Sequence, residues 1–252
     1  MDDQELLRRA EDLFRRSEKK GIVTESTFLT PAERALLEAK FHPAQGMTIR
    51  FFGGTEESER TVAFFFPEDM VVSDDDIPEH VKEQICAIQY RAYFGELGHR
   101  DYLGALLASG ISRDRLGDIL IQGNTATVFC LTGIRSHLLT VDRIGRITVR
   151  AEQIALNSVQ LPQKERKEKS ISVMSMRLDA VAAGMFNLSR SVCARMINEG
   201  CLSLNYSVCM KTDAGIKEGD VISLRGYGKG KVTGIGGTSR KGRQFIRVER
   251  YL

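Results

Sequence analysis

The N-terminal part of the chain alternates between helical and extended patterns. Apolar residues recur at helical spacing among charged ones over residues 6–21, which predicts an amphipathic helix. The segment Thr30-Pro31-Ala32-Glu33 predicts the start of a second helix, because threonine caps a helix, proline suits its first position and glutamate completes a capping box. Apolar runs at 48–52 and 61–66 predict two strands. We expect a small α/β unit over residues 1–78.

A second pattern follows over residues 79–161. Extended runs and helices alternate there, with strands at 85–94, 118–121, 127–131 and 146–150 and helices at 99–110 and 133–142. This βαββαβ order is typical of a ferredoxin-like plait, a fold that many RNA-recognition domains share. The third strand lacks the glycine-aromatic pattern with which those domains stack bases. We therefore interpret this domain as a scaffold or a protein-contact domain.

The C-terminal part begins after a polar stretch. Residues 162–170 lack large apolar side chains, and we predict a solvated linker there. Apolar residues at i, i+3, i+4 and i+7 then predict a helix that starts at Arg177, and Ser189 is placed to cap a second helix that Gly200 ends. Short alternating runs predict strands after it. We expect a helix pair on a small sheet over residues 171–252, so the predicted fold class is α+β with three domains.

The composition argues against several classes of protein. An apolar fraction of 42% with 27% charged residues is ordinary for a globular chain. No apolar run approaches the roughly 20 residues that span a bilayer, and the acidic start lacks the pattern of a signal peptide. The five cysteines form no CxxC pair, which favours reduced thiols. We expect a cytoplasmic protein that is neither secreted, nor membrane-bound, nor disordered.

The charge is distributed unevenly along the chain. Residues 162–252 have 17 Lys and Arg against 8 Asp and Glu, a net charge of +9, whereas the preceding residues have a net charge of −6. A basic module behind an acidic body suggests contact with nucleic acid or another anionic surface. The alternative, that the excess only keeps one face solvated, stays open.

The C-terminal segment also has a motif with fixed spacing. Its anchors are Arg177-Leu178-Asp179, Ser189-Arg190, Ala194, Ile197, Gly200, Leu202, Leu204-Asn205 and Gly219-Asp220-Val221-Ile222. At this spacing they resemble the α-L RNA-binding motif, named after the fourth protein of the small ribosomal subunit. One departure is Tyr206, which stands where many members of the motif have glycine.

Other stretches of the chain narrow the resemblance. Residues 28–31, 51–54, 99–107, 117–120 and 225–230 are similar to the YlmH family, so that the resemblance covers essentially the full length. It implies a non-catalytic bacterial RNA-binding protein that acts on the ribosome. The implied partners are structured RNA (rRNA, tRNA or both) and the large subunit with obstructed peptidyl-tRNA, in translation rescue or nascent-chain quality control.

The motif also implies which side chains face the RNA. They are Arg177, Ser189, Arg190, Arg195, Asn205 and Lys211. Arginine and lysine suit this role because their charged N–H groups bind phosphate oxygens. For each of them the alternative is a solvated charge or a helix cap, and Ser189 suits a cap in either case.

Two other functions stay open. The segment Arg177-Leu178-Asp179 also resembles the catalytic segment of pseudouridine synthases, which would make the chain an RNA-modifying enzyme. Against this, Ala182-Ala183 replaces the usual Thr-Ser, and Asp179 more simply supports the first turn of its helix. The other alternative is a protein-interaction scaffold in which the acidic body matters most.

No cofactor or small-molecule site is predicted. The glycine-rich stretch 226–230 leads into an expected strand and not a helix, so we predict a β-turn and not a nucleotide-binding loop. The four histidines are scattered and no thiols have zinc spacing, so no metal site is expected.

Overall fold

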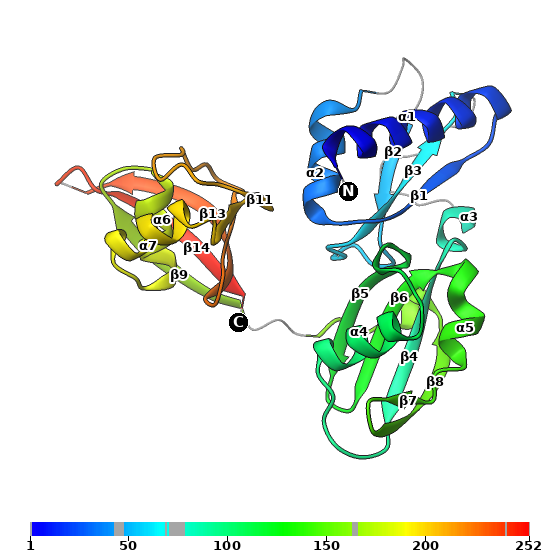
Figure 1. Ribbon diagram of the computed structural model, residues 1–252. Coiled ribbons are helices and arrows are strands. Elements are labelled where there is room, and N and C mark those ends of the chain that lie inside the picture. The colour runs from blue at the N-terminus through cyan, green and yellow to red at the C-terminus, as the bar shows by residue number, and fades with distance from the viewer. Residues whose placement is uncertain are drawn as a thin grey trace. The chain divides into compact units, whose positions relative to one another are not determined.

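The computed structural model describes residues 2–42, 48–68, 70, 79–162, 166–239 and 241–251. It consists of two compact units, Met1–Pro162 and Gln163–Leu252 (Figure 1). The predicted first and second domains lie together in the first unit, and the boundary predicted between them at residue 78 is outside the described residues. Within the described ranges, no helix is long and apolar enough to cross a membrane.

The first unit begins with two helices and a three-stranded antiparallel sheet. In chain order these are α1 (Asp3–Lys20), β1 (Thr24–Leu29), α2 (Pro31–Lys40), β2 (Thr48–Phe52) and β3 (Thr61–Phe66), with strand order β1-β3-β2. The predicted capping box is confirmed, because Thr30 Oγ1 accepts from the Glu33 amide and the Glu33 carboxylate accepts from the Thr30 amide. Strand β1, whose pairing is interrupted by a bulge, is not among the predicted strands.

Strand β3 is buried along its whole length and joins two cores. Ala63 and Phe65 face the core under α1 and α2. Phe64 and Phe66 face the opposite side, where they share a core with Phe129 and other residues of the plait. A continuous apolar run of this kind is expected of a strand that is covered on both faces. The three-stranded sheet and the plait therefore share one apolar core.

The plait follows in the predicted order. Its elements are α3 (Glu79–Lys82), β4 (Ile85–Ala92), α4 (His99–Ala108), β5 (Leu116–Gln122), β6 (Thr125–Leu131), α5 (Arg135–Leu139), β7 (Arg143–Ile144) and β8 (Ile147–Ile154), with 3₁₀ turns at Arg113–Arg115, Thr132–Ile134 and Leu156–Ser158. The antiparallel sheet has the order β5-β6-β4-β8-β7. The short strand β7 is an addition to the predicted βαββαβ pattern. Tyr102 and Leu106 of α4 and Leu138 of α5 pack in one core, so both helices cover the same sheet face.

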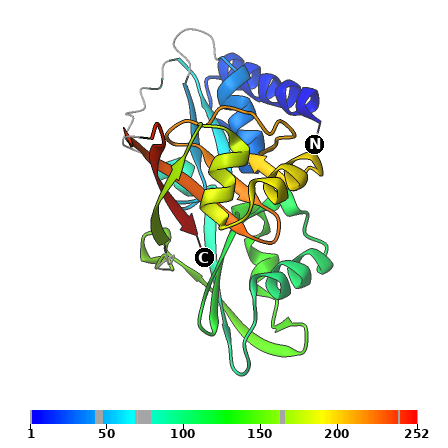
Figure 2. The same cartoon turned by 90° about the vertical axis from the view of Figure 1, so that its left-hand side faces the viewer.

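The second unit is a helix pair on a six-stranded antiparallel sheet. Its elements are β9 (Arg166–Val173), α6 (Leu178–Phe186), α7 (Arg190–Asn198), β10 (Leu202–Leu204), β11 (Ser207–Val208), β12 (Val221–Leu224), β13 (Gly228–Thr238) and β14 (Gln244–Tyr251). The strand order is β11-β10-β12-β13-β14-β9. Helices α6 and α7 lie together on one face of the sheet (Figure 2), over a core of their own.

The predicted linker is too long. Residues 163–165 lie outside the described residues, but strand β9 begins at Arg166 and pairs with β14 through all eight of its residues. The polar half of β9 lies at the edge of the sheet, where charged side chains are typical because they discourage pairing with a further strand. A polar edge strand and a linker therefore look alike in sequence, and in the structure residues 166–170 belong to strand β9.

Candidate nucleic-acid interface

The helix pair turns its apolar stripe inward and its arginines outward. Helix α6 begins after Arg177 and α7 after Ser189, as predicted. The Ser189 hydroxyl accepts a hydrogen bond from the Val192 amide at 3.3 Å, which confirms that it caps α7. Cys193 and Ile197 are fully buried, whereas Arg190 and Arg195 are exposed. Both arginines are therefore on the solvent side of α7.

A buried carboxylate holds two of the predicted arginines. Asp179, in the first turn of α6, is 6% exposed. Its Oδ2 accepts from Arg190 Nη2 at 2.7 Å, and its Oδ1 accepts from Arg177 Nε at 3.3 Å. Both arginine side chains remain about half exposed. Asp179 thus fixes two guanidinium groups side by side at the protein surface.

The ion pairs determine the protonation of this carboxylate. Burial by itself raises the pKa of Asp179, but the hydrogen bonds from Arg190 and Arg177 outweigh it and bring the pKa below its ordinary value. Asp179 is therefore ionised at neutral pH. Its two oxygens are bonded to arginines, an arrangement that favours a structural role over that of a nucleophile.

The loop between β11 and β12, which contains Lys211, is tied to the start of α6. The Leu178 amide donates to the Ala214 carbonyl at 2.9 Å, and the Asp179 amide donates to the Thr212 carbonyl at 3.0 Å. These bonds hold the loop against the start of α6, and the exposed Lys211 directly precedes Thr212 in this loop. The same bonds occupy the first two amides of α6, so these two amides are not available to an anion.

Arg195 is more loosely held. Its side chain is 70% exposed, and its Nε lies 3.9 Å from the Glu199 carboxylate one turn further along α7. An exposed pair at this distance contributes little to stability. Arg195 is therefore free to reorient toward a ligand at small cost.

The Asn205 side chain joins the β10–β11 turn to the start of β12. Its Oδ1 accepts from the Val221 amide at 2.9 Å and its Nδ2 donates to Asp220 Oδ1 at 2.8 Å. It forms the two-residue turn between β10 and β11 with Tyr206, and both residues have positive φ, 48° and 67°. This backbone favours Asn and Gly, so Tyr206 stands at a position where its side chain costs conformational energy.

Lys229 lies next to Tyr206 and is missing from the predicted set. Its Nζ is 5.8 Å from the centre of the Tyr206 ring and 5.4 Å from that of Tyr251. The glycine-rich stretch that contains it turns from β12 into β13, which confirms the predicted β-turn. The sequence could have predicted that Lys229 lies in a strand, but its contact with the rings of Tyr206 and Tyr251 follows only from the tertiary fold.

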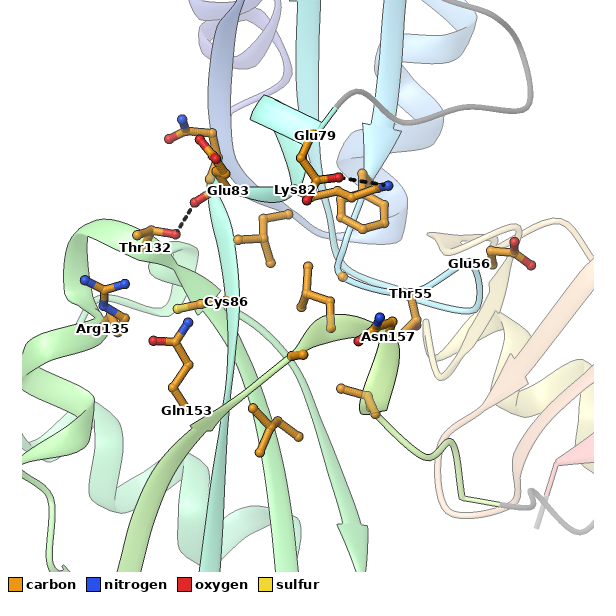
Figure 3. Close-up of a pocket in the computed structure, with 18 of the residues that line it drawn as sticks. Thr55, Glu56, Glu79, Lys82, Glu83, Cys86, Thr132, Arg135, Gln153 and Asn157 are labelled. Atoms are coloured by element: carbon orange, nitrogen blue, oxygen red, sulfur yellow. Dashed lines mark hydrogen bonds and ion pairs between the residues drawn. The ribbon is translucent and has the colours of Figure 1, made fainter.

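The first unit contains a cavity of about 1010 Å³ at the junction of the three-stranded sheet and the plait (Figure 3). Residues of both signs line it, and the charges partly compensate, since Lys82 pairs with Glu79 at 3.4 Å. Cys86 also lines it, and its sulfur lies 3.2 Å from that of Cys130 on the neighbouring strand. The cavity has no dominant charge that would attract an anion.

Comparison with known proteins supports the resemblance found in the sequence. Residues 78–158 match the model of a family described as "Putative RNA-binding domain in YlmH". The chain is 29% identical over 225 residues to the "Ribosome-associated protein quality control protein P2" of Bacillus subtilis (strain 168), with 88% of this chain and 85% of that protein covered. The predicted resemblance to the YlmH family is confirmed.

A solved structure shares the fold. The "Cell division protein ylmH from Streptococcus pneumoniae" superposes with a TM-score of 0.52 at 19% identity, over 64% of this chain and 94% of that one. The YlmH family model covers the plait, which the sequence led us to interpret as a scaffold or protein-contact domain. The description of the family model, in contrast, names a putative RNA-binding domain.

Proposed function

We propose that the protein binds structured RNA on the ribosome and that the second unit holds the RNA. The observation that carries this proposal is the pair of arginines fixed by Asp179 on a unit with a large excess of positive charge. The Bacillus subtilis relative supports it, since that protein is named as ribosome-associated.

The geometry suits phosphate recognition. A guanidinium has five N–H donors in a rigid fork, and each arginine here uses one for Asp179. The remaining donors can reach phosphate oxygens, for which arginine is the preferred partner. Because Asp179 already restricts both side chains, less rotamer freedom is lost on binding. The buried carboxylate thus acts as a positioning group.

We propose further that the target is the large subunit that retains peptidyl-tRNA, in the cytoplasm, and that the protein acts without catalysis. The resemblance to the YlmH family implies this target, and the relative's name contains the words "quality control". The paired state of Asp179 supports a binding role over uridine isomerisation.

The test uses the double variant Arg195→Glu/Lys211→Glu. Both side chains are exposed and neither contacts Asp179, so the fold should persist. We expect loss of co-sedimentation with large subunits and a salt dependence of log K that flattens by about 1.4 to 1.8 for two lost phosphate contacts. Subunits with and without peptidyl-tRNA should be compared, since the proposal predicts stronger binding to the former.

The matched control is Lys19→Glu/Lys20→Glu, which makes the same charge change at exposed positions of α1. Arg190 is unsuitable for charge reversal, because a glutamate there would face the buried Asp179 and would unfold the site. If the Arg195 and Lys211 variant sediments like the control, with the same salt slope, the second unit does not hold the RNA through this surface.

A further inference from the structure

The sheet of the plait has one face that its helices do not cover. Along β4, Cys86, Ile88, Tyr90 and Ala92 point into the core with the helices. The alternate residues Gln89 and Arg91 therefore point to the opposite face. At one end of that face Ala87 packs in the core shared with β3, and beyond it Arg91 is exposed. The free part of the sheet is thus at the far end from the three-stranded sheet.

Two arginines stand opposite each other on this free face. Arg91 on β4 pairs in register with Arg150 on β8, and on its other side with Thr125 on β6. Directly opposed residues have Cβ atoms about 5 Å apart, and like charges in this position repel each other. Neither guanidinium has a hydrogen-bond or ion-pair partner in the described part of the chain. Two adjacent cations without an ion-pair partner among the described residues make a good position for an anion, and the exposed Glu152 on the same face lies one row further along β8, opposite Gln89.

Two exposed aromatic residues adjoin the arginines. Tyr93 and Phe94 follow the end of β4 and are 58% and 85% exposed. The Tyr93 amide donates to the Thr148 carbonyl on β8 at 3.4 Å, which keeps the chain beside β8 just beyond the end of β4. Gly95 then turns with φ 74°, so close to β8 that an added Cβ would lie 3.0 Å from Ile147 Cδ1. The backbone that bears the two exposed rings is therefore held against β8, directly after the strand that carries Arg91.

We propose that this face, formed by Arg91, Arg150, Tyr93 and Phe94, binds unpaired RNA nucleotides. The arginines hold backbone phosphates, and the aromatic rings stack on bases that are not in a duplex. The inference rests on the proposed function in taking RNA as the ligand. The family model that matches residues 78–158 is described as a putative RNA-binding domain, and the inference adds to this description the face that binds and the class of RNA that it takes.

The composition of the face favours single-stranded RNA over other partners. Bases of a duplex are stacked on one another and leave no open face for a protein ring, whereas unpaired bases stack on exposed aromatic side chains of a sheet. A protein-docking surface would be expected to have an apolar centre. Here the row beside the rings consists of Gln122, Thr125, Arg91 and Arg150. The next row consists of Leu120, Thr127, Gln89 and Glu152, and its one apolar residue, Leu120, packs against the core shared with β3.

The experiment measures binding of a fluorescent unstructured oligouridine and of an RNA duplex to the full chain. The background is Arg195→Glu/Lys211→Glu, in which we expect weaker binding by the second unit. Tyr93→Ala/Phe94→Ala should weaken oligouridine binding at least about fivefold, the loss typical of one stacked base, and leave duplex binding unchanged. Tyr93→Phe/Phe94→Tyr keeps both rings and should bind as the background does.

The arginines are tested by Arg91→Glu/Arg150→Glu. We expect weaker oligouridine binding and a salt slope reduced by about 1.4 for two lost single-strand contacts. Matched controls in the same unit are Arg8→Glu/Arg16→Glu for the charge and Leu107→Ala/Leu139→Ala for the exposed apolar area. All these positions are at least partly exposed, and thermal unfolding checks that each variant is folded.

Unchanged oligouridine affinity in the alanine variant, or equal losses in Arg91→Glu/Arg150→Glu and Arg8→Glu/Arg16→Glu, would overturn the inference. Failure of the proposed function gives a different result. In that case Arg195→Glu/Lys211→Glu retains ribosome binding, while Tyr93→Ala/Phe94→Ala and Arg91→Glu/Arg150→Glu still bind the oligouridine more weakly.

Discussion

At the scale of single residues, Asp179 organises the candidate interface. The sequence predicts Arg177 and Arg190 as RNA-facing and Asp179 as a support of its helix. The structure adds that the Asp179 carboxylate binds both arginines. Residues 179 and 190 lie on different helices, so their contact depends on how α6 packs against α7. Local sequence patterns do not contain that information.

Replacing Asp179 tests this organisation. Asp179→Asn should lower the free energy of unfolding by about 1–3 kcal/mol at pH 7, because it removes charged hydrogen bonds to two arginines. The exposed Asp213→Asn is the control. Denaturant unfolding of both variants measures the difference.

The difference in stability between wild type and Asp179→Asn should depend on pH. The pKa of Asp179 is lowered in the folded chain, from about 3.9 in an unfolded one. Its stabilisation is therefore complete above that value and disappears as the pH falls through the folded pKa. The gap between wild type and Asp179→Asn should close at acid pH. A gap that is equal at pH 7 and pH 3 would show that the carboxylate does not stabilise the fold through its charge.

At the scale of elements, the predictions succeed where a segment has its own local signal. The capping box of α2, the cap at Ser189 and the glycine that ends α7 are all local, and all are confirmed. Strand β9 is missed because its charged half resembles a linker. Strand β14 has a readable signal, since Ile246 and Val248 alternate with charged residues and are fully buried.

The packing of α6 on the sheet depends on a small residue. A Cβ on Gly230 of β13 would lie 2.6 Å from Met185 Sδ and 2.9 Å from the Glu249 carbonyl oxygen. The methionine can move, but the neighbouring backbone cannot. Gly230→Ala should therefore cost about 1–3 kcal/mol of stability. Gly237→Ala on the same strand meets nothing within 4 Å and should be close to neutral in thermal unfolding, so equal effects at both sites would contradict this packing.

At the scale of the whole molecule, charge and folding divide the chain in the same place. The basic excess falls in the second unit, which has its own apolar core and all the strands of its own sheet. The composition predicts this division, but the shared core that joins the first two predicted domains follows only from the tertiary structure. Because β9 begins at Arg166, a self-contained fragment starts at residue 163 and not at residue 171.

The most direct test of the account is binding of the fragment 163–252 to large ribosomal subunits that retain peptidyl-tRNA, measured by sedimentation beside the fragment 1–162. We expect the fragment 163–252 to be folded, to bind with most of the affinity of the full chain, and to lose binding with Arg195→Glu/Lys211→Glu. A folded fragment 163–252 that stays in the ribosome-free fraction, while residues 1–162 bind as the full chain does, would contradict the account.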